Sequence, residues 1–162
     1  MQASKYVITL TGHDKFQAEL EDLKVNRRQE VAQKIKEARE QGDLSENAEY
    51  DAAKDEQRDI EARIEWLEKI LNNSEVVDES KVDTTEIGIG CKITLWDEEY
   101  EEEILYDVTG SIEADSLKGK ISNESKLGKA LMGKKEGDVV EVESNAGVLL
   151  YKVMKIERSN QN

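Results

Sequence analysis

The sequence is poor in residues that break helices, form disulfides or bind metals. Its 162 residues include no proline, one cysteine and one histidine. The absence of proline removes the strongest helix breaker, so long uninterrupted helices are permitted. The single cysteine, Cys91, excludes an intrachain disulfide and fits a reducing compartment. One histidine and one cysteine are also too few to form a zinc site.

Basic charge and long apolar runs are scarce as well. The chain has 23 Lys and Arg residues against 37 Asp and Glu residues, a net charge of -14 at pH 7. Such a balance argues against broad binding of the isolated chain to a nucleic-acid backbone. No window approaches the ~18 apolar residues of a membrane span, so we expect a soluble, cytoplasmic protein with no membrane partner. Phosphate-binding loops, dinucleotide fingerprints and nucleophile elbows are also missing, which disfavours a self-contained active site.

What is present is helical periodicity in two long stretches. The first helix is expected to start near Gly12, because Thr11 to Asp14 has the T-x-x-D form of a helix N-cap. Its seam positions follow at steps of 4, 3, 4, 4, 4 and 3: Phe16, Leu20, Leu23, Arg27, Val31, Ile35 and Ala38. The repeated fours are a stutter, which relaxes left-handed supercoiling. The second helix has steps that alternate between 3 and 4: Tyr50, Ala53, Gln57, Ile60, Ile64, Leu67 and Leu71. A very short turn joins the two stretches, so they predict an antiparallel coiled coil.

The turn between these helices carries two carboxylates. Gly42 can supply the positive φ that ends a helix, and Asp43 with Glu46 has the D-x-x-E spacing that can start the next one. Under one interpretation the two acids only cap the second helix, a contribution of ~1 kcal/mol, and spacing alone favours this. Under the other they bind a divalent cation such as Mg²⁺, for which a partner must supply further ligands because the ion needs about six. The two roles are compatible, since a cap would fix the loop.

Basic residues flank the same turn. Arg39 lies on the first helix, and Lys54 and Arg58 lie one turn apart on the second. This cluster could contact a single phosphate group, although charges at such spacings usually form a solvated helix face.

The rest of the chain changes to a period of two. Residues 72–88 lose helical periodicity and predict a linker or a domain boundary. Apolar and charged residues then alternate in four predicted strands, at 91–96, 100–108, 138–143 and 148–156. A short helix is expected from Lys126 to Met132, closed by Gly133. We therefore predict an α+β fold with two domains, a helical hairpin over residues 1–77 and a mostly antiparallel sheet with a short helix over residues 78–162.

Three segments resemble the Gre family of bacterial transcript-cleavage and transcription elongation factors. The hairpin segment 37–54 reads EAREQGDLSENAEYDAAK, segment 121–144 reads ISNESKLGKALMGKKEGDVVEVES, and the opening segment 9–20 reads TLTGHDKFQAEL. The resemblance covers nearly the whole chain and implies an N-terminal coiled coil with a C-terminal domain of FKBP-like fold. The modest basic patch is more similar to that of the GreA subgroup than to the extended patch of the GreB subgroup.

The resemblance also implies a function inside another enzyme. Such factors dock on RNA polymerase by the globular domain and insert the coiled coil into the secondary channel; the matching docking positions here are Ser122, Ser125 and Leu127. The family's tip acids match Asp43 and Glu46. They would help to retain a Mg²⁺ ion that is shared with the polymerase and not held stably by the factor alone. The polymerase then cleaves backtracked nascent RNA near its 3′ end and rescues arrested complexes. The chain would thus be a monomeric accessory factor and not itself an enzyme.

Three alternatives stay open. One is an inhibitor that occupies the same channel without promoting cleavage, against which the presence of Asp43 and Glu46 argues. Another is an FKBP-like prolyl isomerase or chaperone, against which the absence of an evident aromatic pocket in residues 100–156 argues. The last is a coiled-coil adaptor whose tip acids are only caps.

Two positions depart from the family pattern: Lys126 stands where proline is usual, and Ser45 where a basic residue is common.

Overall fold

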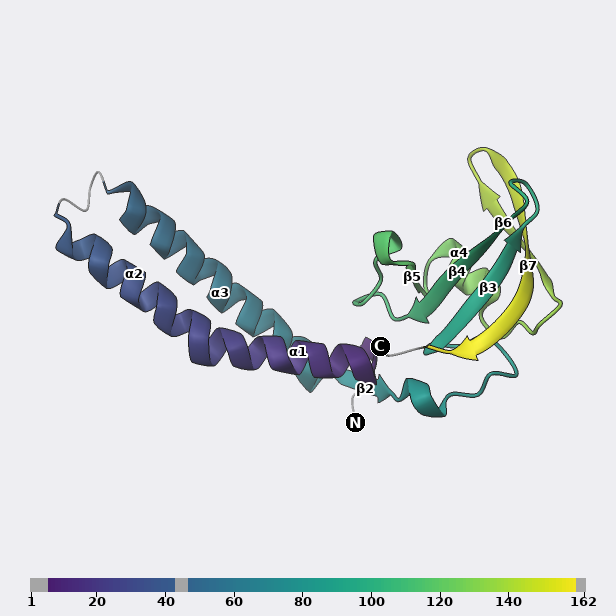
Figure 1. The fold of residues 1–162 in the computed structure, drawn as a ribbon, viewed down its shortest axis with the longest axis horizontal. Coiled ribbons are helices and arrows are strands. Elements are labelled where there is room, and N and C mark those ends of the chain that lie inside the picture. Colours follow the sequence, from purple (N-terminus) through teal and green to yellow (C-terminus); the bar gives the residue numbers. More distant parts are fainter. Residues whose placement is uncertain (1–5, 43–46, 160–162) are drawn as a thin grey trace. The chain divides into compact units, whose positions relative to one another are not determined.

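The computed structural model describes residues 6–42 and 47–159 (Figure 1). Packing divides the chain into two units. Residues 14–73 form the helical unit, and the segments before and after them form the sheet unit. Each unit has its own hydrophobic core.

The helical unit is an antiparallel hairpin. Its first arm consists of α1 (Leu10–Asp22) from Asp14 onward, the single π-helical turn η1 (Leu23–Arg27) and α2 (Arg28–Glu40), and its second arm is α3 (Ala48–Asn72). The two arms lie side by side along the hairpin (Figure 1). Its core consists of buried residues that the periodicity predicted: Leu20, Leu23, Val31, Ile35, Ala53, Ile60, Ile64 and Leu67. The predicted coiled-coil hairpin is therefore confirmed. Within the described ranges, no helix is both long and apolar enough to cross a membrane.

The stutter in the first seam coincides with η1. In this turn the Arg28 amide donates to the carbonyl oxygen of Leu23, which is an i→i+5 bond instead of the usual i→i+4 bond. The wider turn accommodates one residue more than an α-helical turn. Leu23 and Val31 therefore both face α3 and are buried, although they lie eight positions apart in the sequence.

Ion pairs connect the two arms on either side of this seam. Their N···O distances lie between 2.5 and 3.0 Å: Glu19–Arg63, Lys24–Glu68, Arg27–Glu56, Arg28–Glu61 and Lys34–Glu56. Exposed pairs of this kind contribute about 0–1 kcal/mol each. Their main consequence is to specify the register in which the arms pair. Arg27, which the periodicity placed in the seam, reaches out of it to Glu56.

The sheet unit is built on five strands. These are β3 (Cys91–Asp97), β4 (Glu102–Thr109), β5 (Lys120–Ser122), β6 (Val139–Ser144) and β7 (Gly147–Arg158), in the spatial order β5-β4-β3-β7-β6. All neighbours are antiparallel except β4 and β5. Cys91, Ile93 and Leu95 of β3 are fully buried, and the short helix α4 (Lys126–Leu131) contributes Leu131 to the same core. The predicted α+β architecture is confirmed, with the single-turn η4 (Ser116–Lys118) preceding β5.

One strand of a second, two-stranded sheet lies within residues 72–88, where the sequence predicted a linker or boundary and indicated no strand. In this segment β2 (Ser74–Val77) pairs in parallel with β1 (Tyr6–Thr9), and the single-turn η3 (Glu79–Lys81) follows. Its partner strand lies 68 positions earlier, as in the pair Tyr6 and Ser74, so no local pattern indicated the pairing.

The start of the first helix also differs from the prediction. The helix begins at Leu10, and the Gly12 amide donates to the hydroxyl of Thr9 at 3.1 Å. Thr11, predicted as the cap, instead donates its hydroxyl to Glu79 Oε2 at 2.7 Å. The helix starts earlier because Thr9, the last residue of β1, supplies the cap with its own side chain.

Candidate functional site

The structure describes the two helix ends that flank the segment with the predicted acids. On the first side α2 ends at Glu40, and Gly42 adopts a φ of 121°, as the sequence predicted for a residue that ends a helix. On the second side the description resumes at Asn47. Asp43 and Glu46, the two predicted catalytic and metal-binding residues, lie outside the described residues.

The cap of α3 is Asn47 and not Asp43. The Tyr50 amide donates to Asn47 Oδ1 at 3.1 Å, and α3 begins at Ala48. The D-x-x-E pattern therefore misplaced the start of this helix by several residues. Asn is as strong an N-cap as Asp, and Glu49 and Asp51 in the first turn add favourable interactions with the helix dipole. An Asn directly before a helix-forming run with acids in its first turn is a signal from which the cap could have been found.

Asn47 also bridges the two arms. Its Nδ2 group donates to the carbonyl oxygen of Ala38 at 2.6 Å, and Ala38 lies in the last turn of α2. This carbonyl is one of those that a helix C-terminus leaves without an i→i+4 partner. One side chain thus accepts from an amide at the start of α3 and donates to a carbonyl at the end of α2, which also accepts from the Gln41 amide at 3.3 Å.

Of the predicted basic cluster, Arg39 lies nearest to this bridge. Its guanidinium carbon lies 5.9 Å from the centre of the Tyr50 ring, a cation–π contact between the two arms. Lys54 Nζ donates to Gln57 Oε1 at 3.1 Å. Arg58 is exposed and pairs with Asp55 on its own helix. Each of the three predicted cations therefore contacts a different partner.

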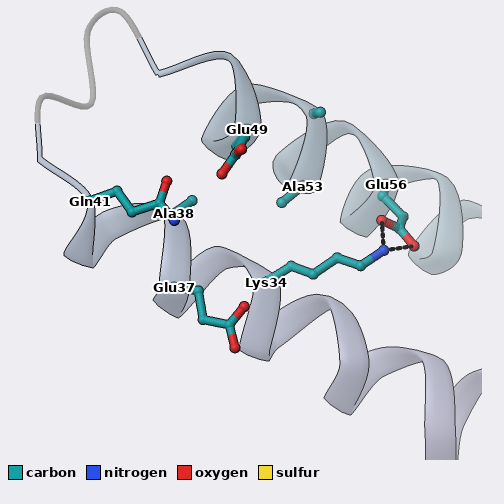
Figure 2. A pocket seen from close by; sticks show the side chains of 8 residues that line it. Lys34, Glu37, Ala38, Gln41, Glu49, Ala53 and Glu56 are labelled. Carbon is teal, nitrogen blue, oxygen red and sulfur yellow. Dashed lines mark hydrogen bonds and ion pairs between the residues drawn. The ribbon is translucent and has the colours of Figure 1, made fainter.

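The seam next to the tip encloses a pocket of about 300 Å³ (Figure 2). Larger aliphatic residues fill the seam further along, whereas three alanines line the pocket: Ala38, Ala52 and Ala53. Charged or polar side chains surround these alanines: Lys34, Glu37, Gln41, Glu49 and Glu56. Figure 2 shows Lys34 extending from α2 to the carboxylate of Glu56 on α3. Hydrogen bonds from Lys34 and Arg27 hold the pKa of Glu56 below its usual value, so this carboxylate stays ionised.

Among the residues that the structure describes, no three His, Cys, Asp or Glu side chains gather in a way that would hold a metal ion. Carboxylate oxygens are the ligands that Mg²⁺ prefers, and the ion keeps several waters or takes oxygens from a partner.

The three predicted docking residues lie around the start of α4 in the sheet unit. Ser125 caps that helix, because the Gly128 amide donates to its hydroxyl at 3.1 Å. The same hydroxyl lies 2.7 Å from the carbonyl oxygen of Ser122, at the end of β5. Leu127 packs against the core of the sheet unit. The structure thus brings the three residues together, and Lys126 between them is exposed.

Comparisons with known proteins identify both units. Residues 6–76 match the family described as "Transcription elongation factor, N-terminal", and residues 82–158 match "Transcription elongation factor, GreA/GreB, C-term". The chain is 59% identical over 160 residues to the transcription elongation factor GreA of Lachnoclostridium phytofermentans, an alignment that covers 99% of this chain and 100% of the relative. It is 51% identical to GreA of Thermoanaerobacter pseudethanolicus, with 94% of this chain and 97% of the relative covered.

Among solved structures, GreA factor homolog 1 (Gfh1) of Thermus thermophilus aligns with 93% of this chain and 97% of its own, at 31% identity and a TM-score of 0.42. The two family matches together cover most of the sequence, and the identity to the GreA proteins extends along nearly its full length. The chain belongs to the GreA/GreB family of transcription elongation factors.

Proposed function

We propose that this protein stimulates the cleavage of backtracked nascent RNA by bacterial RNA polymerase, and that it does so by inserting the helical hairpin into the secondary channel of the polymerase. Membership of the GreA/GreB family supports the role in elongation. The hairpin supports the mode of action, since the 25 residues of α3 give a helix about 38 Å long. A narrow pair of helices of that length can carry side chains deep into a channel.

The observation that carries this proposal is the identity of the α3 cap. The interpretation without a catalytic role needed Asp43 to cap the second helix and Glu46 to complete a capping box. Asn47 supplies the cap, and Tyr50 occupies the N3 position at which a capping box requires Glu or Gln. Helix capping therefore does not explain why two acids stand at the turn, and a role toward a partner becomes the better explanation.

In the proposed mechanism, Asp43 and Glu46 present carboxylate oxygens inside the catalytic centre of the polymerase. There they would complete the ligand set of a Mg²⁺ ion whose other ligands the polymerase would supply. Such an ion would supply the chemistry of water activation and charge stabilisation at the attacking and leaving oxygens. In this proposal Asp43 and Glu46 only hold and orient the ion. The RNA that is hydrolysed and the other catalytic groups are bound in the polymerase, so the protein is an accessory factor.

Other parts of the chain have supporting roles in this proposal. Arg39 on α2 and Lys54 and Arg58 on α3 would approach a phosphate of the RNA 3′ segment. Docking would use the surface around Ser122, Ser125 and Leu127. Because Ser125 and Leu127 also stabilise α4, substitutions there must be checked for folding before a loss of binding is assigned to docking.

The test is transcript shortening in a stalled polymerase complex with wild type, Asp43→Ala and Glu46→Ala. Wild type should shorten the RNA in a Mg²⁺-dependent manner. Each variant should remain folded, compete with wild type for the polymerase and lose most of the stimulation. If both variants stimulate cleavage like wild type, the acids have no catalytic role. Binding without cleavage by wild type would instead indicate an inhibitor.

A further inference from the structure

Asn47 makes two hydrogen bonds with different consequences. Its Oδ1 accepts from the Tyr50 amide at 3.1 Å, which stabilises the first turn of α3. Its Nδ2 donates to the Ala38 carbonyl oxygen at 2.6 Å, which joins α3 to the last turn of α2. Only the first is a helix cap. The second closes a loop of nine positions in the chain.

The residues around this bridge are packed. Ala38 is 2% exposed and lies in the seam, so the accepting carbonyl belongs to a buried part of the hairpin. Arg39, the residue after Ala38, lies over the ring of Tyr50, and the amide of Tyr50 donates to Asn47. We call these four residues, Ala38, Arg39, Asn47 and Tyr50, the tip clamp. The clamp borders the segment with Asp43 and Glu46 on both sides.

The chemistry of the clamp requires an amide side chain. Ser and Asp cap helices about as well as Asn does, but neither offers an N–H donor of the same reach. Helix capping alone would therefore be satisfied by several residue types. Asn47 adds the hydrogen bond from its Nδ2 group to the Ala38 carbonyl oxygen. This bond sets the distance between the end of α2 and the start of α3, whereas a cap stabilises α3 alone.

We propose that Asn47 is a positioning residue for the tip acids: its bridge to Ala38 fixes the helix ends from which Asp43 and Glu46 are presented. The inference rests on the proposed function, because it assigns Asn47 a part in the same reaction. A bridge that fixes the separation of the two helix ends lowers the entropic cost of bringing both acids to one metal ion. Asn47 itself does not contact the metal ion or the RNA in this proposal.

The decisive variant is Asn47→Ser, which keeps a capping hydroxyl, adds no charge and loses the donor to Ala38. Asn47→Ala removes both bonds. The control is Ala62→Gly, a change at an exposed position of α3 that lowers helix stability by about 1 kcal/mol without touching the tip clamp. For each, the rate of transcript shortening at saturating factor is measured across a Mg²⁺ titration, together with competition for polymerase and the melting temperature.

We expect Asn47→Ser to melt close to wild type and to compete normally, yet to shorten RNA roughly 5-fold more slowly at limiting Mg²⁺, the factor that corresponds to one neutral hydrogen bond. Higher Mg²⁺ should restore its rate. Ala62→Gly should melt lower but keep the wild-type rate and Mg²⁺ dependence. A Mg²⁺ dependence for Asn47→Ser that matches wild type would overturn the inference, as would a loss in Ala62→Gly as large as that in Asn47→Ala.

Failure of the proposed function has a different signature. If Asp43→Asn and Glu46→Gln shorten RNA at the wild-type rate, the tip acids have no catalytic role and the proposed function falls. If those variants lose activity while Asn47→Ser behaves as wild type, the proposed function stands and only the positioning role of Asn47 is wrong.

Discussion

Deleting Asn26 should leave the helical hairpin folded, whereas deleting Gln33 should disrupt it. The two residues are a matched pair, because both are exposed on the first arm and each makes a side-chain hydrogen bond to a residue four positions away. They differ in location. Asn26 lies in the π-helical turn η1, and Gln33 lies in the α-helical part of α2.

The physical reason is the extra residue that η1 accommodates. In wild type the Arg28 amide donates to the carbonyl oxygen of Leu23, five positions earlier. Without Asn26 these two residues are four positions apart, so the turn becomes α-helical and α2 keeps its orientation. Removing Gln33 rotates the rest of α2 by about 100°. Ile35 and Ala38, which are 7% and 2% exposed, then leave the seam. Losing their burial should lower the free energy of unfolding of the hairpin by about 2–4 kcal/mol.

Urea unfolding followed by Trp66 emission measures this difference. Trp66 reports on the hairpin because its ring packs against Phe16 with centroids 5.8 Å apart, and a Trp96→Phe background removes the signal of the sheet unit. Asn26 deletion should shift the midpoint little. A loss of stability for the Asn26 deletion as large as that for the Gln33 deletion would refute the explanation of the π-helical turn.

Three further predictions concern single positions. Lys126→Pro should stabilise the sheet unit by about 0.4–1 kcal/mol in urea unfolding, because Lys126 is the first residue of α4 and Ser125 before it has the extended φ of -68° and ψ of 163° that proline requires of its predecessor. Hydrogen bonds from Arg63 lower the pKa of Glu19 in the folded protein below its usual value of 4.5. The stability that this pair adds is therefore present above pH 4.5 and is lost as the pH falls through the lowered pKa of the folded protein. In Arg63→Met this acid-dependent loss, at most about 1 kcal/mol for a partly exposed pair, should vanish from a pH series of hairpin melting. The Cys91 thiol is fully buried and its pKa is raised by that burial, so it should react with a thiol reagent only after urea unfolding.

Residues whose partners lie nearby in the sequence could be predicted. The seam of α3 from Ala53 to Leu67 and the alternation in β3 report directly on burial, because each pattern repeats the geometry of its own element. The stutter around Arg27 was visible as a break in spacing. The sequence did not indicate that a π-helical turn would absorb it, since bonding over five positions leaves no separate pattern in the residues.

Pairings over long distances were not predictable in the same way. The parallel pair β1–β2 and the bond from Thr11 to Glu79 depend on residues far apart in the chain. At the tip, several polar residues in a row were each capable of capping α3, so spacing alone selected Asp43 when Asn47 is the cap. The family resemblance named the two acids, and the bridge from Asn47 to Ala38 became visible only with both helix ends in place.

The central claim is that the tip acids act by their charge within the catalytic centre of the polymerase. Its most direct test is the rate constant of transcript shortening with a double variant, Asp43→Asn with Glu46→Gln, added at saturation to a stalled complex. These changes preserve side-chain size while removing the carboxylates that a metal ion requires. We expect a melting temperature and a polymerase affinity equal to those of wild type, with a rate at least about tenfold lower. A wild-type rate would contradict the account.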